Sequence, residues 1–283
     1  MKGSAVDTLL ATVGLPQAHR TEPVGGGSIS EAIRATLGDG RVVFIKRLRK
    51  APAGFFQAEA DGLRAIAGIA GCRTPEVLGV TEQGLVLEWL DGAPARDFAA
   101  QLGRGLAAMH ASGSDRFGFD DDNFCGLTPQ PNPWIADGHA FFAEARLLYQ
   151  GRRARDAGLL GKMDLSRLET LAAKLPDWVP RMPASLIHGD LWSGNVHCDE
   201  QGAPVLIDPA AHYGWAEADL AMTTLFGRQS PAFYDAYMSA STIVGRDWEE
   251  RAPLYNLYHL LNHLNLFGGG YQSQVRQVLS RYV

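Results

Sequence analysis

The stretch from residue 186 to residue 210 constrains this chain more than any other, because it sets four polar side chains at fixed spacings around an apolar run. It reads Leu-Ile-His188-Gly-Asp190-Leu-Trp-Ser-Gly-Asn195, and Val-Leu-Ile-Asp208 follows after a short gap. An Asn therefore lies five residues after the first Asp, and a second Asp closes the apolar run. This spacing indicates that a loop and the end of a strand together supply the side chains of one catalytic site.

The spacing is that of a kinase catalytic loop, in which His-x-Asp and a later Asn are followed by a metal-binding Asp. Phosphoryl transfer from ATP requires the protein mainly to position the reactants and to neutralise charge. We therefore expect Asp190 to face the attacking hydroxyl as the catalytic base, and Asn195 and Asp208 to hold Mg²⁺ on the phosphates. His188 titrates near neutrality and is an alternative base, although the spacing favours a histidine that orders the loop.

The composition is that of an ordinary globular protein, with 46% hydrophobic and 20% charged residues. The 283 residues suffice for two lobes. A net charge of -5 gives no basic footprint, so nucleic acid is not an expected partner. Cys72, Cys125 and Cys198 are odd in number and lack Cys-x-x-Cys spacing, which argues against a disulfide framework and against a zinc site.

We also expect no membrane association. No stretch approaches the roughly 18 apolar residues that a membrane span needs, and no signal-peptide pattern follows the start of the chain. These features predict a cytoplasmic protein.

The pattern of apolar residues changes near Asp91, which predicts two lobes, 1–90 and 91–283. The first lobe reads as β-rich, with strands at 29–37, 41–48, 77–80 and 85–90 and a helix at 55–69. The second reads as mainly helical, with a long loop at 115–133, two short strands at 196–198 and 204–207, and helices at 97–110, 141–155, 165–175, 217–226, 231–240, 250–266 and 273–282. The predicted fold class is α+β, a bilobal protein-kinase-like fold with a small nucleotide-binding lobe and a larger catalytic and substrate-binding lobe.

A kinase also needs a glycine-rich turn, a lysine on the phosphates and a glutamate paired with that lysine. Gly26, Gly27 and Ser28 form a candidate phosphate turn, with a plain hairpin turn as the alternative. Lys46 ends a Val-Val-Phe-Ile run and is the candidate lysine, with a solvated strand end as the alternative. Glu59 is its candidate partner, and nearby Asp61 competes for that role.

Two further predictions concern the adenine-binding strand end and a residue that supports the catalytic loop. The strand that ends at Glu88 and Leu90 leads into a turn between the lobes, whose backbone groups could bind the adenine edge. Asp219, in a Glu-Ala-Asp-Leu-Ala helix start, is predicted to accept hydrogen bonds and brace the catalytic loop.

These motifs together resemble the fructosamine kinase (ketosamine 3-kinase) family, whose fold is similar to that of the aminoglycoside and choline phosphotransferases. The resemblance rests on His-Gly-Asp-Leu-Trp-Ser-Gly-Asn at 188–195 and on shorter matches along the whole chain, including Pro129-Gln-Pro-Asn-Pro-Trp134 and Leu261-Asn-His263-Leu-Asn265. It implies ATP- and Mg²⁺-dependent phosphorylation of a ketoamine at the sugar 3-hydroxyl, which leads to deglycation of an amine or protein. The family usually has Asp-Trp where this chain has Asp137-Gly138, which concerns substrate specificity.

Substrate recognition is less constrained by the sequence. Trp192 lies inside the catalytic loop and is a candidate to pack against the sugar or the amine, with a core tryptophan as the alternative. His263 and Asn265 could line the same cleft or satisfy one another, and Trp134 is a further candidate from its motif. Two other functions remain: another small-molecule kinase of the aminoglycoside or choline phosphotransferase type, and an inactive nucleotide-binding module. The oligomeric state is open, and we favour a monomer.

Overall fold

The structure, a computed structural model, describes residues 5–25 and 30–283. Its first part is an antiparallel sheet with the strand order β1-β2-β3-β5-β4. The strands are β1 (Ala18–Pro23), β2 (Glu31–Leu37), β3 (Val42–Arg47), β4 (Val77–Thr81) and β5 (Gly84–Glu88). The four predicted strands correspond to β2, β3, β4 and β5, and β1 is a strand that the sequence analysis did not identify. The predicted glycine turn at Gly26, Gly27 and Ser28 lies outside the described residues.

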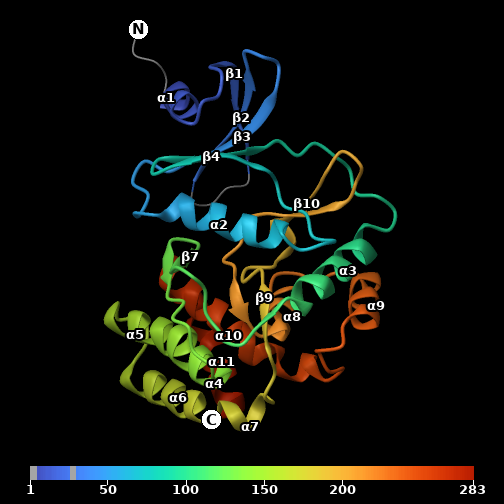
Figure 1. Cartoon of the computed structure of the whole chain (residues 1–283). Coiled ribbons are helices and arrows are strands. Elements are labelled where there is room, and N and C mark those ends of the chain that lie inside the picture. The colour runs from blue at the N-terminus through green and yellow to red at the C-terminus, as the bar shows by residue number, and fades with distance from the viewer. Residues whose placement is uncertain (1–4, 26–29) are drawn as a thin grey trace.

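A helix covers each face of this sheet (Figure 1). On one face α1 (Ala5–Thr12) packs Leu10 against Ile45 of β3. On the other face α2 (Phe55–Ala67) buries Phe56, Ala60, Leu63 and Ile66, which recur at helical spacing. Because β3 is covered on both sides, its apolar residues do not alternate with polar ones.

The second part of the chain is mainly helical, so the predicted α+β class is confirmed (Figure 1). Its longest helix, α10, runs through the middle of the main core, where Leu254, Leu257, Leu261 and Leu264 are fully buried. The helices are α3 (Phe98–Ala111), α4 (Gly138–Phe141), α5 (Tyr149–Asp156), α6 (Lys162–Ala173), α7 (Leu175–Trp178), α8 (Ala216–Met222), α9 (Pro231–Ala240), α10 (Trp248–Phe267) and α11 (Gln272–Tyr282).

Two segments depart from the predicted pattern. Residues 142–148 form a π-helical turn between α4 and α5, inside the single helix predicted at 141–155. The loop predicted at 115–133 contains a hairpin of β7 (Asn123–Cys125) and β8 (Thr128–Gln130). Buried side chains hold this hairpin in place, because Gln130 donates to Asn123 Oδ1 and Asn123 donates to the Ala211 carbonyl.

Short strands frame the loops of the second part. A three-stranded sheet has the order β12-β9-β6, formed by β12 (His212–Gly214), β9 (Ala184–Ile187) and β6 (Gly113–Ser114). A two-stranded sheet pairs β10 (Val196–Cys198) with β11 (Pro204–Leu206), as predicted. The catalytic loop thus leaves β9 and enters β10, and Asp208 follows β11.

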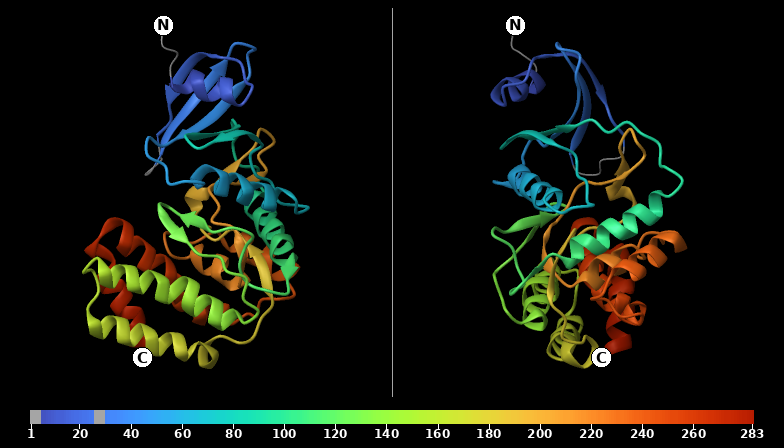
Figure 2. Two further views of the ribbon diagram at one scale, coloured as in Figure 1. Left: turned by 60° about the vertical axis from the view of Figure 1, so that its left-hand side comes forward. Right: turned by 45° about the vertical axis from the view of Figure 1, so that its right-hand side comes forward.

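The sheet lies above the helical part in both views of Figure 2, and the connection between these two parts is tightly packed. A Cβ on Gly92 would lie 1.8 Å from the Asp199 carbonyl oxygen, so only glycine fits there. Arg73 also contacts both sides, because its guanidinium pairs with Glu88 at 2.6 Å and with Asp199 at 3.4 Å. The lobe boundary near Asp91 falls in this segment and stays a prediction.

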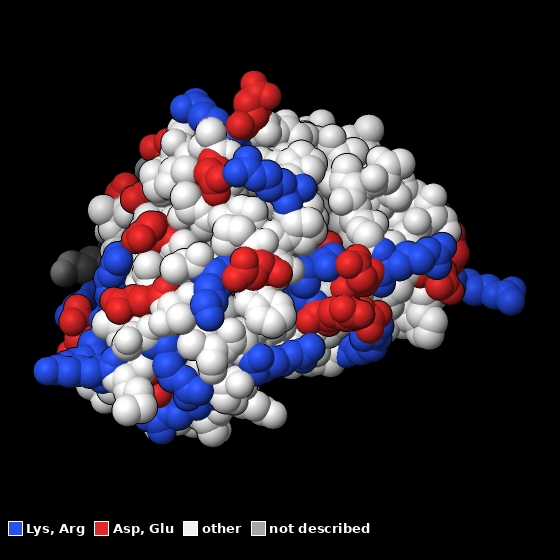
Figure 3. Space-filling model, turned by 90° about the horizontal axis from the view of Figure 1, so that it is seen from below, with Lys and Arg blue, Asp and Glu red and all other residues white. Residues whose placement is uncertain are grey.

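The surface seen from below carries basic and acidic side chains interspersed over the helices, without a large patch of one sign (Figure 3). This distribution agrees with the slightly negative net charge of -5. Among the described helices, none combines the length and the apolar character needed to cross a bilayer.

Candidate active site

The catalytic loop starts with a glycine that has no substitute. Gly189 has a φ of +79°, and a Cβ at this position would lie 2.2 Å from the Ala210 carbonyl oxygen. The loop then tightens into a 3₁₀ turn at Ser193–Asn195 before β10 begins. The backbone on either side of Asp190 is therefore held in one conformation.

Asp219 of α8 fixes the start of the loop. Its two carboxylate oxygens accept the N–H groups of His188 at 2.7 Å and of Gly189 at 2.9 Å. His110 of α3 lies 3.2 Å from the same carboxylate and 2.7 Å from the Tyr237 hydroxyl. Although burial alone would raise its pKa, the hydrogen bonds and the charge of His110 hold the pKa of Asp219 below its usual value. The Asp219 carboxylate is thus bonded both to the start of the loop and to His110.

His188 is engaged within the loop by both ring nitrogens. Its Nε2 donates to the Ile207 carbonyl at 2.9 Å, and its Nδ1 accepts the N–H of Asp190 at 3.3 Å. The imidazole is fully buried, and this burial lowers its pKa. A neutral histidine with both nitrogens occupied has no lone pair for a substrate hydroxyl, so its geometry is that of a loop-ordering residue.

Asp190 has the environment of a base poised near neutrality. Its side chain is partly exposed and lies between two buried residues, Gly189 and Leu191. Burial and the nearby charge of Asp208 raise the pKa of Asp190, and the hydrogen bond from Asn195 lowers it. The net result is a pKa of about 7. The amide of Asn195 donates to the Asp190 carbonyl at 2.8 Å and approaches its carboxylate at 3.3 Å.

The Asn195 side chain is oriented as a metal ligand would be. Its NH₂ group is held by Asp190, and no described residue donates a hydrogen bond to its Oδ1. Asp208, beyond β11, has a φ of 55°, an uncommon backbone conformation for a residue with a Cβ. One amide oxygen and one carboxylate are the hard ligands that Mg²⁺ prefers. These two residues therefore fit a magnesium ion.

Lys46 joins Asp208 to the first sheet. Its ammonium donates to Glu59 Oε1 at 2.7 Å and to the carboxylate of Asp208. Despite burial, these two carboxylates hold the lysine charged and raise its pKa. Asp61, the competing partner, instead accepts from Gln57 and Arg64. Lys46 is 8% exposed and shares the α2-facing side of β3 with Phe44, so the pairing predicted between Lys46 and Glu59 is present.

At the strand end predicted to bind adenine, the Glu88 side chain makes structural contacts. The Glu88 carboxylate pairs with Arg73 and also accepts the N–H of Glu76 at 3.1 Å. Leu90 is half-buried in the segment that follows β5. The Glu88 side chain therefore stabilises the connection after β5, and nucleotide binding by the backbone at this point stays a prediction.

Trp192 opens a row of aromatic side chains beside the catalytic loop. It is 38% exposed and contacts Phe226, which in turn contacts His263 at a ring distance of 4.9 Å. Phe267 and Tyr271 extend the row beyond His263. Phe226, Phe267 and Tyr271 were not singled out from the sequence, because nothing local marks them as neighbours of the loop. We call these five residues the aromatic row.

Two predicted substrate residues are placed differently. Asn265 donates to the Gln150 carbonyl and to its side-chain oxygen, at 3.0 and 2.7 Å, so its amide anchors α10 to α5. His263 Nδ1 donates to the His259 carbonyl at 2.7 Å, so His263 and Asn265 do not satisfy one another. Trp134 packs against Tyr213 and Arg116, and none of its contacts with described residues joins it to the catalytic loop.

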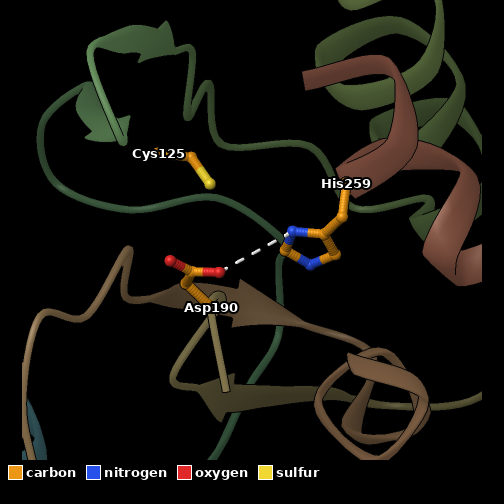
Figure 4. A group of neighbouring side chains, drawn as sticks. All are labelled: Cys125, Asp190 and His259. Carbon is orange, nitrogen blue, oxygen red and sulfur yellow. Dashed lines mark ion pairs between the residues drawn. The ribbon is translucent and has the colours of Figure 1, made fainter. Parts of the chain in front are cut away.

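The sequence analysis missed a buried polar group behind Asp190. Arg146, in the π-helical turn, donates to the Pro131 carbonyl and to Asn132, each at 2.6 Å. His259 of α10 brings its Nδ1 to 3.9 Å from Asp190 Oδ1, and Cys125 of β7 lies beside both (Figure 4). Cys125 and His259 carry no motif of their own, since only the tertiary fold brings them to the loop.

Comparisons with known proteins show one consistent likeness. The fructosamine kinase family profile matches residues 2–283. A probable ketoamine kinase from Synechocystis is 43% identical, over 95% of this chain and 92% of its own length. The chloroplastic protein-ribulosamine 3-kinase of Arabidopsis thaliana is 37% identical, over 92% of this chain and 81% of its own length.

Solved structures agree with this result. A Thermobifida fusca protein described as a fructosamine-3-kinase superposes with a TM-score of 0.87 at 34% identity, covering 99% of this chain and 98% of its own. An ADP-bound aminoglycoside phosphotransferase has a TM-score of 0.61 at 12% identity, covering 99% and 97%. The second likeness concerns the fold alone.

Proposed function

Because the chain belongs to the fructosamine kinase family, we propose that it transfers the γ-phosphoryl group of ATP to the 3-hydroxyl of a sugar ketoamine. The chain is an ATP-dependent phosphotransferase, as its sequence predicted. The observation that carries the proposal is the cluster of Lys46, Asp190, Asn195 and Asp208, because each member has the environment that its step requires.

Asp190 is proposed as the group that receives the substrate proton. A sugar hydroxyl has a high pKa, so it must be aligned and must lose its proton late in the transfer. A carboxylate whose pKa is about 7 is half ionised near neutral pH and can return the proton to solvent afterwards. The two N–H groups bound by Asp219 keep the loop that carries Asp190 in place.

Lys46, Glu59, Asn195 and Asp208 are proposed to bind the nucleotide. Lys46 would contact the phosphates, and Glu59 would orient it through their 2.7 Å ion pair. Asn195 and Asp208 would hold Mg²⁺, which neutralises phosphate charge when it is bound. Gly26, Gly27 and Ser28 and the backbone at Glu88 and Leu90 remain predicted nucleotide contacts.

The aromatic row is proposed to bind the acceptor. Trp192 lies two residues after Asp190, so a ring stacked on its indole would lie next to the base. Phe226 and Phe267 are 40% and 56% exposed, which leaves apolar faces for the amine-bearing part of the substrate. His263 belongs to this row, whereas Asn265 and Trp134 have weaker support as substrate contacts.

The product explains why such a reaction would serve deglycation. A phosphate ester at carbon 3 lies next to the carbonyl at carbon 2. Enolisation towards carbon 1 therefore gives an enaminol that expels phosphate, and water hydrolyses the resulting imine to the free amine and a dicarbonyl sugar. A cytoplasmic location and a monomeric state remain predictions. The alternative acceptors, an aminoglycoside or choline, have only the shared fold in their favour.

The test is a direct assay of acceptors with ATP and Mg²⁺. Ribulosyl-lysine, erythrulosyl-lysine and fructosyl-lysine should each be tested beside kanamycin and choline, and phosphorus NMR should locate the phosphate. We expect a phosphate at the sugar 3-position of at least one ketoamine. Faster turnover of kanamycin or choline than of every ketoamine would reject the proposal.

A further inference from the structure

Three side chains with metal-binding atoms meet behind the catalytic loop (Figure 4). Cys125 comes from β7, Asp190 from the loop and His259 from α10. The sulfur, one carboxylate oxygen and one ring nitrogen all lie within 4.8 Å of one another. The sequence spacing of the cysteines argued against a zinc site, but spacing reports only ligands that are close along the chain.

The imidazole of His259 is incompletely bonded. Its side chain is nearly buried, and Nδ1 has no hydrogen-bond partner among the described residues. The separation of 3.9 Å from Asp190 Oδ1 is too long for a hydrogen bond. Buried polar atoms are nearly always partnered, so an orphan that faces a thiol and a carboxylate indicates a missing ligand.

The donor set selects a particular class of ion. Thiolate sulfur and imidazole nitrogen are soft or borderline ligands that suit Zn²⁺, whereas Mg²⁺ prefers oxygen. In a tetrahedral zinc site, bonds of about 2.0–2.3 Å place ligand atoms roughly 3.3–3.8 Å apart. The His259 to Asp190 distance is already close to this range, and the remaining contraction is about 1 Å, within reach of side-chain rotation.

The charges also match. One thiolate and one carboxylate neutralise a divalent cation, and His259 stays neutral because burial lowers its pKa to about 3. Burial raises the pKa of the Cys125 thiol, so an ion must displace the thiol proton to solvent, as zinc does with coordinated thiols. The amide of Asn262 donates to Cys125 Sγ at 3.2 Å and supports the negative sulfur.

We propose that Cys125, Asp190 and His259 form an inhibitory binding site for Zn²⁺, separate from the magnesium ligands Asn195 and Asp208. Bound zinc takes the carboxylate that receives the substrate proton, so phosphoryl transfer stops while the ion is present. A fourth position is left for water. The inhibition rests on the proposed function of Asp190, whereas the binding itself does not.

Binding is tested without any assay of activity. Co²⁺ added to the metal-free, full-length protein should produce a cobalt–thiolate charge-transfer band in the near ultraviolet, and Zn²⁺ should remove it stoichiometrically. Cys125→Ser should abolish the band, and His259→Gln should weaken Zn²⁺ affinity at least tenfold. Cys198→Ser is the matched control, since Cys198 is a free, half-buried thiol on β10, and it should keep the band.

The same proteins then test the inhibition. The rate of each protein with Zn²⁺ is compared with its own rate without Zn²⁺, both at saturating Mg²⁺. Stoichiometric Zn²⁺ should abolish ketoamine phosphorylation by the wild type and by Cys198→Ser, with recovery on adding a chelator, and Cys125→Ser should resist it. A band that persists in Cys125→Ser, or equal Zn²⁺ affinity in wild type and His259→Gln, would overturn the site. An enzyme with no ketoamine activity at all but a Cys125-dependent band would refute the proposed function and the inhibition, and leave the zinc site standing.

Discussion

Replacement of Lys46 by Met should reveal how strongly Glu59 depends on its partner. The side chains of Lys46 and Glu59 are 9% and 12% exposed, so the pair is close to the buried limit. Removing one member of a buried pair leaves an uncompensated charge and typically costs about 3–5 kcal/mol. The Asp208 carboxylate is 40% exposed, so water replaces the lysine there at little cost. We expect Lys46→Met to lower the free energy of unfolding by about 3 kcal/mol.

This loss should depend on pH, because Glu59 can take up a proton. Burial already raises the pKa of Glu59 against the opposing charge of Lys46, and loss of the lysine raises it further. A carboxyl whose pKa is higher in the folded than in the unfolded state destabilises the fold above its unfolded pKa, and this effect disappears below it. The difference between wild type and Lys46→Met should therefore be small near pH 4.5 and should grow towards pH 8.

A double-mutant cycle with Glu59→Gln completes the test. Glu59→Gln alone should cost less, about 1–2 kcal/mol, because Lys46 keeps Asp208. The double variant should be no worse than Lys46→Met, because it no longer carries an uncompensated Glu59 charge. The coupling should therefore be at least about 1–2 kcal/mol, and the stability of the double variant relative to wild type should change less with pH. Urea unfolding followed by tryptophan fluorescence at pH 5 and pH 8 measures all four proteins. Additive, pH-independent losses would refute the assignment of Glu59 as the partner of Lys46.

Three further predictions concern the catalytic loop. Because burial and Asp208 raise the pKa of Asp190 to about 7, kcat/KM should fall as the pH drops below about 7 and level off above it; a flat profile down to pH 5 would contradict this. Asp219→Asn should destabilise the protein by about 2 kcal/mol and lower kcat, since one buried N–H loses its acceptor, whereas the control Asp164→Asn, at a partly exposed pair with Arg276, should leave kcat unchanged. Asn195→Ala should require a higher Mg²⁺ concentration for half-maximal rate, with an unchanged unfolding midpoint; an unchanged magnesium requirement would remove Asn195 from the metal site.

The parts of the fold that were predicted from sequence are those with a strong local period. The helix at 231–240 has the predicted bounds because proline starts it and its apolar face repeats. β9 was missed because its four residues are all buried and pair with residues 113–114 and 212–214, which lie far away in the sequence. Local patterns do not report such long-range pairing, and the same holds for β12.

The residues of the candidate site also fall into those that local spacing reveals and those that only tertiary packing brings together. Asp190, Asn195 and Asp208 could be proposed from the sequence because the chemistry expected of them requires one loop and one strand end, which leaves a fixed spacing. The orientation of Lys46 was open from its neighbours alone, and it follows from α1 and α2 covering both faces of β3. Cys125 and His259 could not be found, because only the packing of the β7–β8 hairpin and α10 against the loop brings them to Asp190.

The most direct test of this account is the rate of ketoamine phosphorylation by Asp190→Asn. Asparagine can still align the hydroxyl but cannot accept its proton, and general-base catalysis contributes about a hundred- to ten-thousand-fold. We expect kcat to fall by about this factor in a steady-state assay with ribulosyl-lysine, while ATP affinity, measured by calorimetry on the same protein, stays near the wild-type value. An Asp190→Asn enzyme that keeps most of its kcat, or that loses ATP binding instead, would contradict the account.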